Sequence, residues 1–337
     1  MDDMIKVSLA GFGRIGRDVL RQTINRNDIQ IVSISDTADK ANLIYLLKYD
    51  SIYGRFEKEV VETENGISID GTEIIFNKWK NAEESDWSSL DTDVLILATG
   101  KSQTKDEVDL HLSKGCKKVI VASTPSDLNE FPIYIPGAND TEINFDENVI
   151  SLGSNTANAV CPILKELNNE LGVERAFLTT VHGYSNSNRL ADVAGEGFRL
   201  NRAAGENIIP SITKSSEVIE TVLPFLKNKV ASSSMTVPIP DGSTVDLTID
   251  IKKESTIDEI NNLLQNFSTS SLKNIIGITY DPIVSSDVVK SSLSGLVDGL
   301  STMSIANKKI KLIIWFDNGW GYSARIIDTI EKLNLEK

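Results

Sequence analysis

Near the start of the chain, the hydrophobic residues first form a short continuous run and then recur at helical spacing. An apolar run at residues 5–10 leads into a glycine-rich turn, and then into a segment whose apolar residues recur at helical spacing. A second apolar run follows the helical segment and ends at Asp36. A short buried run, a turn, an amphipathic helix and a second buried run together predict one β-α-β unit.

Three further short apolar runs lie within residues 93–100, 117–123 and 148–153. They alternate with polar or helical stretches, as a parallel sheet with crossover helices requires. The first half of the chain is therefore expected to be a doubly wound parallel sheet of the Rossmann type.

The pattern changes after Ser154. An apolar helical stretch is followed by long strands in which polar and apolar residues alternate, as in strands with one buried and one exposed face. The stretches concerned are residues 158–171, 176–185, 232–240, 243–253 and 309–317. We expect an α/β protein whose second domain is α+β with a largely antiparallel sheet.

Composition narrows the function classes. The chain has 337 residues and a formal net charge of −14, and its length favours two domains. Acidic charge spread along the chain argues against binding to nucleic acid or to an anionic membrane. The sequence has no long apolar run and no basic, apolar leader, which predicts a cytoplasmic protein. Cys116, Cys161, His111 and His182 offer neither a disulfide framework nor a metal-ligand spacing, so we expect no metal.

The turn after the first apolar run has the sequence GFGRIG. Gly11, Gly13 and Gly16 have the spacing of a dinucleotide-binding turn, which brings a pyrophosphate close to the backbone and to a helix N-terminus. Asp36 ends the next strand, where a carboxylate holds the ribose hydroxyls and repels a 2′-phosphate. Thr37 could bond a phosphate, so NAD is expected and NADP stays open. The predicted cofactor site also includes Phe12, Arg14 and Ile15.

Several longer stretches resemble the glyceraldehyde-3-phosphate dehydrogenase family, most of all its bacterial and chloroplast branch. They are GFGRIGR, LLKYDSIYGRF, TTVHGYSNSNRLAD, RAAGENIIPSIT, VPIPDGSTVDLT and WFDNGWGYSAR. The resemblance implies an NAD-binding Rossmann domain at residues 1–153, a catalytic domain at 154–320 and a C-terminal helix at 321–337 that packs back on the first domain. It also implies a homotetramer, in which the long connection between the strand at 176–185 and residue 208 makes subunit contacts.

The resemblance also assigns cofactor and catalytic positions. Asn318 would contact the nicotinamide carboxamide, and Thr99, Gly100 and Ser123 would line the cofactor cleft. The family's catalytic histidine is matched by His182, a side chain suited to proton transfer near neutral pH.

The nucleophile loop departs from the family pattern. The family loop S-C-T-T-N-C aligns without a gap to SNTANA, which places Asn155 at the catalytic cysteine and Ala159 at the second one. Thr236 stands at the position where the family has an arginine that helps to bind the substrate's phosphate. Neither cysteine is expected to replace the thiol: Cys161 lies about two helical turns beyond Asn155, and Cys116 precedes a strand.

The resemblance implies a second anion site, used for inorganic phosphate, whose residues match the family better than Thr236 does. Lys214 stands where the family has glycine. His111 is not among the predicted site residues, and we interpret it as an exposed or packed surface residue of a helix. The remaining predicted substrate and anion residues are Ser154, Thr156, Ser185, Ser187, Arg202 and Thr213.

An amide cannot form the hemithioacetal that phosphorylating aldehyde oxidation requires, but it can donate a hydrogen bond to a carbonyl or alkoxide oxygen. The sequence therefore favours an NAD(P)-dependent oxidoreductase that transfers a hydride to or from a small, phosphorylated or polar carbonyl or alcohol. Two alternatives stay open. One is a silent NAD-binding paralogue with an assembly or sensing role, and the other is ordinary glyceraldehyde-3-phosphate dehydrogenase activity through an unrecognised nucleophile.

Overall fold

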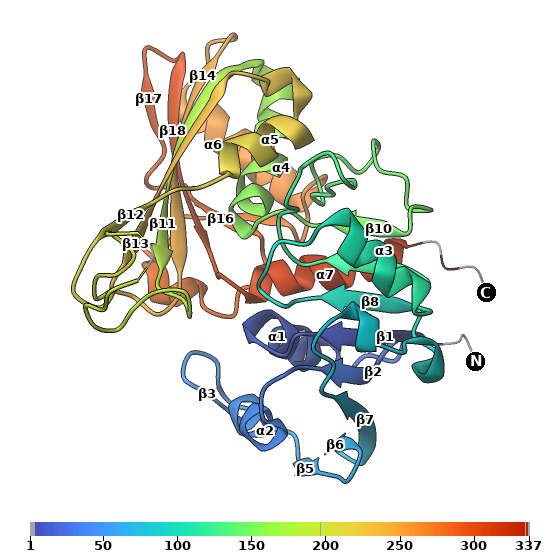
Figure 1. Ribbon diagram of the computed structural model, residues 1–337. Helices are drawn as coiled ribbons and strands as arrows, with labels where there is room; N and C mark the ends of the chain where they lie inside the picture. Colours follow the sequence, from blue (N-terminus) through green and yellow to red (C-terminus); the bar gives the residue numbers. More distant parts are fainter. Residues whose placement is uncertain (1–3, 196, 334, 336–337) are drawn as a thin grey trace. The chain divides into compact units, whose positions relative to one another are not determined.

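The computed structural model describes residues 4–195, 197–333 and 335. The chain divides into two compact units (Figure 1). The first unit extends to Tyr134 and also includes Glu142–Gly153 and the chain from Ser323 on, and the second comprises Ile135–Thr141 and Ser154–Tyr322. This division lies close to the predicted domain boundaries, which remain predictions.

The first unit is built on a sheet with the strand order β10-β9-β8-β1-β2-β7-β6-β5. The strands from β10 to β7 run parallel, while β6 and β5 add an antiparallel edge that the sequence analysis did not predict. The bounds are β1 Ile5–Ala10, β2 Ile29–Ser35, β5 Val60–Glu62, β6 Gly66–Ile69, β7 Thr72–Asn77, β8 Val94–Leu97, β9 Lys118–Val121 and β10 Val149–Ser151.

A helix connects β1 to β2, as the β-α-β prediction requires, and another connects β8 to β9. Strands β8 and β9 are buried at every position, because a doubly wound sheet is covered on both faces. The other elements are α1 Arg14–Thr23, α2 Lys40–Lys48, α3 Lys105–Ser113, the short pair β3 Tyr49–Asp50 and β4 Gly54–Arg55, and 3₁₀ turns at Ala82–Glu84 and Ser88–Leu90. Helix α7 (Trp320–Lys332) belongs to this unit from Ser323 on.

The second unit has a mixed sheet with the order β12-β13-β11-β14-β18-β16-β15, and β17 pairs with β18. Most pairs are antiparallel as predicted, but β11 pairs with β13 and β15 with β16 in parallel. The bounds are β11 Val173–Gly183, β12 Ile209–Ser211, β13 Val230–Val237, β14 Ser243–Ile251, β15 Ile276–Thr279, β16 Gly295–Asp298, β17 Met303–Ile305 and β18 Lys309–Phe316.

Helices cover one face of this sheet. Figure 1 shows α4, α5 and α6 on the same side of β11, β14 and β18. Their bounds are α4 Asn155–Leu171, α5 Ser215–Val222 and α6 Ile257–Thr269, with 3₁₀ turns at Pro224–Leu226 and Ser285–Val288. Along β11 the buried Leu178 and the exposed Phe177 mark the covered and the open face. His182 has the parity of Leu178, so it lies on the helix-covered face.

Within the described parts of the chain, no helix is both long enough and apolar enough to cross a membrane.

Candidate active site

The glycine turn after β1 is shaped for a dinucleotide. A Cβ on Gly16 would meet the Gly11 carbonyl oxygen at 2.3 Å, and one on Gly11 would meet the Ala98 oxygen at 2.5 Å. A Cβ on Gly13 would meet nothing within 4 Å, so the space above this residue is open. Gly13 is also the N-cap of α1, and it gives that helix no side-chain cap. The uncapped amides beside an open glycine fit the diphosphate of NAD.

Asp36 follows β2 and is held by the backbone around it. One carboxylate oxygen accepts from the Phe12 amide at 2.7 Å, and the other accepts from the Ala38 amide at 2.9 Å. A carboxylate has about four acceptor positions, so it can still accept from ribose hydroxyls. Thr37, the predicted alternative phosphate contact, is exposed next to it.

The other predicted cofactor residues of this unit follow β8 and β9. Thr99 accepts from the side chain of Gln103 at 3.1 Å, and Ser123 donates to the Lys101 carbonyl at 3.1 Å. Like the glycine turn and Asp36, they lie at the carboxyl ends of parallel strands, the edge at which α/β sheets bind ligands.

In the second unit, Asn155 is the first residue of α4, and Ser154 caps that helix by accepting from the Ala157 amide at 3.2 Å. Hydrogen bonds hold both the oxygen and the nitrogen of the Asn155 side-chain amide. Its Oδ1 accepts from the Thr156 amide at 2.8 Å, and its Nδ2 donates to the Asn318 carbonyl at 3.1 Å. A side-chain amide has two N–H donors, so Asn155 has the capacity for one donated bond besides the one to Asn318.

His182 lies on β11, beside Thr236 of β13 in the parallel register. Its Nδ1 is 3.0 Å from the Ser243 hydroxyl, its Nε2 is 3.5 Å from the Thr156 hydroxyl, and its ring packs edge-on against Phe316. Burial lowers the pKa of His182 to about 4. The imidazole is therefore neutral near pH 7, which makes it a proton acceptor before it can be a donor.

Two residues that the sequence analysis did not single out complete this cluster. Ser243 donates to the Asn318 side-chain oxygen, and Asp241 accepts from the Asn318 amide at 3.0 Å. Both lie in the stretch VPIPDGSTVDLT, whose only signal in the sequence is its resemblance to the family. Asn318 thus connects the two predicted catalytic side chains, because its backbone carbonyl holds Asn155 and its side chain holds Ser243, the neighbour of His182.

Five of the predicted substrate and anion residues lie outside this cluster, in three separate loops. Thr213 bonds the Ser215 hydroxyl at 2.7 Å, and the exposed Lys214 is the N-cap of α5. Ser185 and Ser187 bond each other at 2.9 Å in the turn after β11. Arg202 forms an exposed ion pair with Asp192, in which its Nε lies 2.9 Å from the carboxylate. A second anion would therefore compete with Asp192 for this guanidinium.

The cysteines and His111 are buried or packed. Cys161 is wholly buried in α4, and burial raises the pKa of its thiol. Burial also raises the pKa of Cys116 to about 12. His111 packs in α3 and accepts a hydrogen bond from the Trp87 indole at 3.2 Å, so its prediction as a packed residue is correct and the exposed alternative is wrong. Among the residues that the structure describes, no cluster of three or more His, Cys, Asp or Glu could hold a metal.

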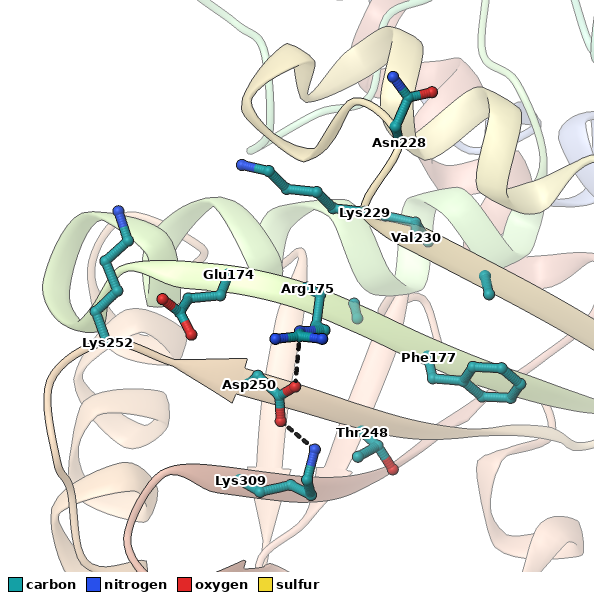
Figure 2. Close-up of a pocket in the computed structure, with 12 residues that line it drawn as sticks. Glu174, Arg175, Phe177, Asn228, Lys229, Val230, Thr248, Asp250, Lys252 and Lys309 are labelled. Carbon is teal, nitrogen blue, oxygen red and sulfur yellow. Dashed lines mark hydrogen bonds and ion pairs between the residues drawn. The ribbon is translucent and has the colours of Figure 1, made fainter.

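A hollow of about 740 Å³ lies elsewhere on the second unit, over one end of β11, β13, β14 and β18. Figure 2 shows Arg175 and Lys309 directed at Asp250, and the Arg175 Nε lies 3.0 Å from that carboxylate. Phe177 also lines the hollow, and it points to the face opposite His182. None of the predicted site residues lines this hollow.

Comparison with known proteins places this cluster in a family. Residues 5–105 match the NAD binding domain of glyceraldehyde 3-phosphate dehydrogenase, and residues 154–318 match its C-terminal domain. The chain belongs to the glyceraldehyde-3-phosphate dehydrogenase family. It is 41% identical over 336 residues to glyceraldehyde-3-phosphate dehydrogenase of Borreliella burgdorferi, covering 98% of this chain and 99% of that protein. It is 36% identical over 327 residues to glyceraldehyde-3-phosphate dehydrogenase 2 of Bacillus subtilis, covering 97% and 96%.

Membership of the glyceraldehyde-3-phosphate dehydrogenase family confirms three predictions at the level of the family: an α/β fold with a Rossmann-type first sheet, NAD as the cofactor, and an oxidoreductase. A third relative, from Thermotoga maritima, is 38% identical over 332 residues. The roles of the individual site residues remain predictions.

Proposed function

We propose that this protein catalyses reversible hydride transfer between NAD and a small, polar or phosphorylated carbonyl or alcohol, without a covalent intermediate. The observation that carries the proposal is the fixed amide of Asn155 in the same hydrogen-bonded cluster as a neutral imidazole. NADP remains an alternative cofactor, since Thr37 is exposed beside Asp36.

The chemistry follows from the two side chains. In the oxidation direction, His182 would accept the proton of the substrate hydroxyl. Bound NAD⁺ would supply the hydride acceptor for the carbon-bound hydrogen, so that a carbonyl would remain. The second N–H of Asn155 donates to the substrate oxygen and stabilises the alkoxide that develops there. The reverse reaction returns the proton from the imidazolium to the oxygen as the hydride is delivered.

The two cysteines support a mechanism without a thiol. A thiolate is the reactive form of cysteine, and burial raises the pKa of both thiols far above neutrality. Cys161 also has no exposed surface from which to attack a substrate. These properties disfavour ordinary glyceraldehyde-3-phosphate dehydrogenase activity through a relocated nucleophile.

The test begins with a screen of NAD(P)H turnover against phosphorylated sugars, ketoses and polyols. With the substrate found, Asn155→Ala should lower the rate by about 10² to 10³, and His182→Ala by about 10² to 10⁴. Asn169→Ala, on the exposed side of the same helix α4, is the matched control and should have no effect. A variant without both cysteines should keep nearly full activity. If thiol removal abolishes turnover, or if Asn155→Ala is harmless, the proposal is wrong.

Asn155→Cys gives an independent test of the departure from the family loop. It places a thiol in the cluster that contains His182, and we expect this thiol to react with iodoacetamide faster than Cys116 or Cys161. Thr236 would still leave the phosphate of glyceraldehyde 3-phosphate poorly held, so only weak acyl-enzyme chemistry is expected.

We further propose that the protein is a homotetramer and works in the cytoplasm. The connection between β11 and β12 exposes several large apolar side chains, which is typical of contact surfaces. Leu190 is 86% exposed and Phe198 is 97% exposed in the single chain. Light scattering at micromolar concentration should give a tetramer, and Phe198→Asp should shift it toward smaller species. A wild-type monomer would exclude the assembly.

A further inference from the structure

The hydrogen bonds of Ser243 determine which nitrogen of His182 carries the proton. Ser243 is fully buried, and its hydroxyl donates to the side-chain oxygen of Asn318. A hydroxyl has a single proton, so toward any other partner Ser243 can only accept. The Nδ1 atom of His182 lies 3.0 Å from this oxygen and must therefore be the donor.

The other ring nitrogen is consequently an acceptor. With the proton on Nδ1, a neutral imidazole has a bare lone pair on Nε2. The nearest protein partner of Nε2 is the Thr156 hydroxyl at 3.5 Å, which is long for a hydrogen bond. This lone pair is therefore available to a substrate proton.

His111 shows the opposite arrangement. The Trp87 indole can only donate, and its Nε1 lies 3.2 Å from the Nδ1 atom of His111. His111 must accept at Nδ1, so its proton lies on Nε2. These are the two histidines of the chain, and the contacts assign them different tautomers.

We propose that Ser243, oriented by Asn318, is a positioning residue that holds His182 in the Nδ1–H tautomer and so presents Nε2 as the proton acceptor of the reaction. Ser243 does not itself react, because it is buried and lies on the Nδ1 side of the ring. The catalytic consequence rests on the proposed function, whereas the tautomer itself does not.

The tautomer is measurable without a substrate. Long-range ¹H–¹⁵N correlation spectra of histidine-labelled protein at pH 7.5 distinguish a protonated from a bare ring nitrogen. We expect His182 to show a protonated Nδ1 and a bare Nε2, and His111 to show the reverse. His182→Gln and His111→Gln assign the two sets of signals. An Nε2–H tautomer for His182 in the wild-type protein would overturn the inference.

Ser243→Ala removes the acceptor while changing the volume little. We expect the Nδ1–H population of His182 to fall, with Ser243→Thr restoring it, while His111 stays unchanged and reports that the fold is intact. An unchanged His182 tautomer in Ser243→Ala would show that Ser243 does not set it. If Ser243→Ala fails to fold, the wild-type spectrum still decides.

Activity separates this inference from the proposed function. On a substrate found by screening, Ser243→Ala should lower kcat by about 10²-fold, the lower end of what a general acid or base contributes, and leave KM nearly unchanged. If the spectra are as expected but no hydride transfer is found, the proposed function fails and the positioning role stands. If the protein turns over but His182 has the Nε2–H tautomer, only the positioning role fails.

Discussion

Acidification is expected to destabilise this protein through its two histidines. Burial lowers the pKa of both His111 and His182 to about 4. No carboxylate bonds either ring among the described residues, although Glu107 raises the pKa of His111 slightly against the larger effect of burial. Both imidazoles are therefore held neutral in the folded state at a pH where the unfolded chain would already be protonated.

The sign follows from proton binding. Unfolded histidine titrates near pH 6.5, so between pH 6.5 and about 4 the unfolded state binds more protons and the free energy of unfolding falls as the pH falls. Above pH 6.5 the two states bind equally and the contribution is complete. Each unit of difference between the folded and unfolded pKa corresponds to about 1.4 kcal/mol of free energy. Each histidine therefore lowers the free energy of unfolding by up to about 3 kcal/mol across this window. The two together approach the whole stability of a typical domain.

The assay is urea denaturation at fixed protein concentration and several pH values between 7.5 and 4.5. His111→Gln keeps an acceptor for the Trp87 indole, so it isolates the loss of the titrating group. The free energy of unfolding of this variant should depend less steeply on pH than that of the wild-type protein. The difference in slope should correspond to about one fewer proton taken up on unfolding. Carboxylates titrate alike in both proteins and cancel in the difference. Equal slopes for the two proteins would refute the assignment of the effect to His111.

Three further outcomes are expected. Gly13→Ala should fold normally but bind NAD more weakly in calorimetry, whereas Gly16→Ala should destabilise the protein, since its Cβ would meet the Gly11 carbonyl; equal stability of the two variants would contradict this. Asp36→Ala should weaken NAD binding and also reduce stability by about 1–3 kcal/mol, because two backbone amides lose their acceptor; unchanged NAD affinity would exclude a ribose contact. Cys161→Ser should be less stable than Cys161→Ala by about 1–3 kcal/mol, because it buries an unpaired hydroxyl; the reverse order would indicate a polar partner.

Features that depend on local spacing could be predicted from the amino-acid sequence. The turn GFGRIG, the helix after it and Asp36 at the end of β2 were predicted correctly as a β-α-β unit, because a buried strand, a glycine turn and an amphipathic helix each leave a periodic pattern. The expectation that Asn155 stands in the family's nucleophile loop also comes from one continuous stretch of the chain, and it remains a prediction.

The tertiary structure decided the features that depend on distant segments. Periodicity cannot predict the parallel pairing of β11 with β13, because the direction of a strand is set by the path of the chain between strands. Nor could it predict that Ser243 lies between His182 and Asn318, because these three residues come from three different segments of the second unit.

The same holds for the charge of His182. The sequence identified His182 only as a side chain suited to proton transfer near neutral pH. Its pKa depends on burial by the fold, which keeps the imidazole neutral in the folded protein. The identity of the side chain thus sets which reactions His182 is capable of, and its surroundings in the fold set its protonation state.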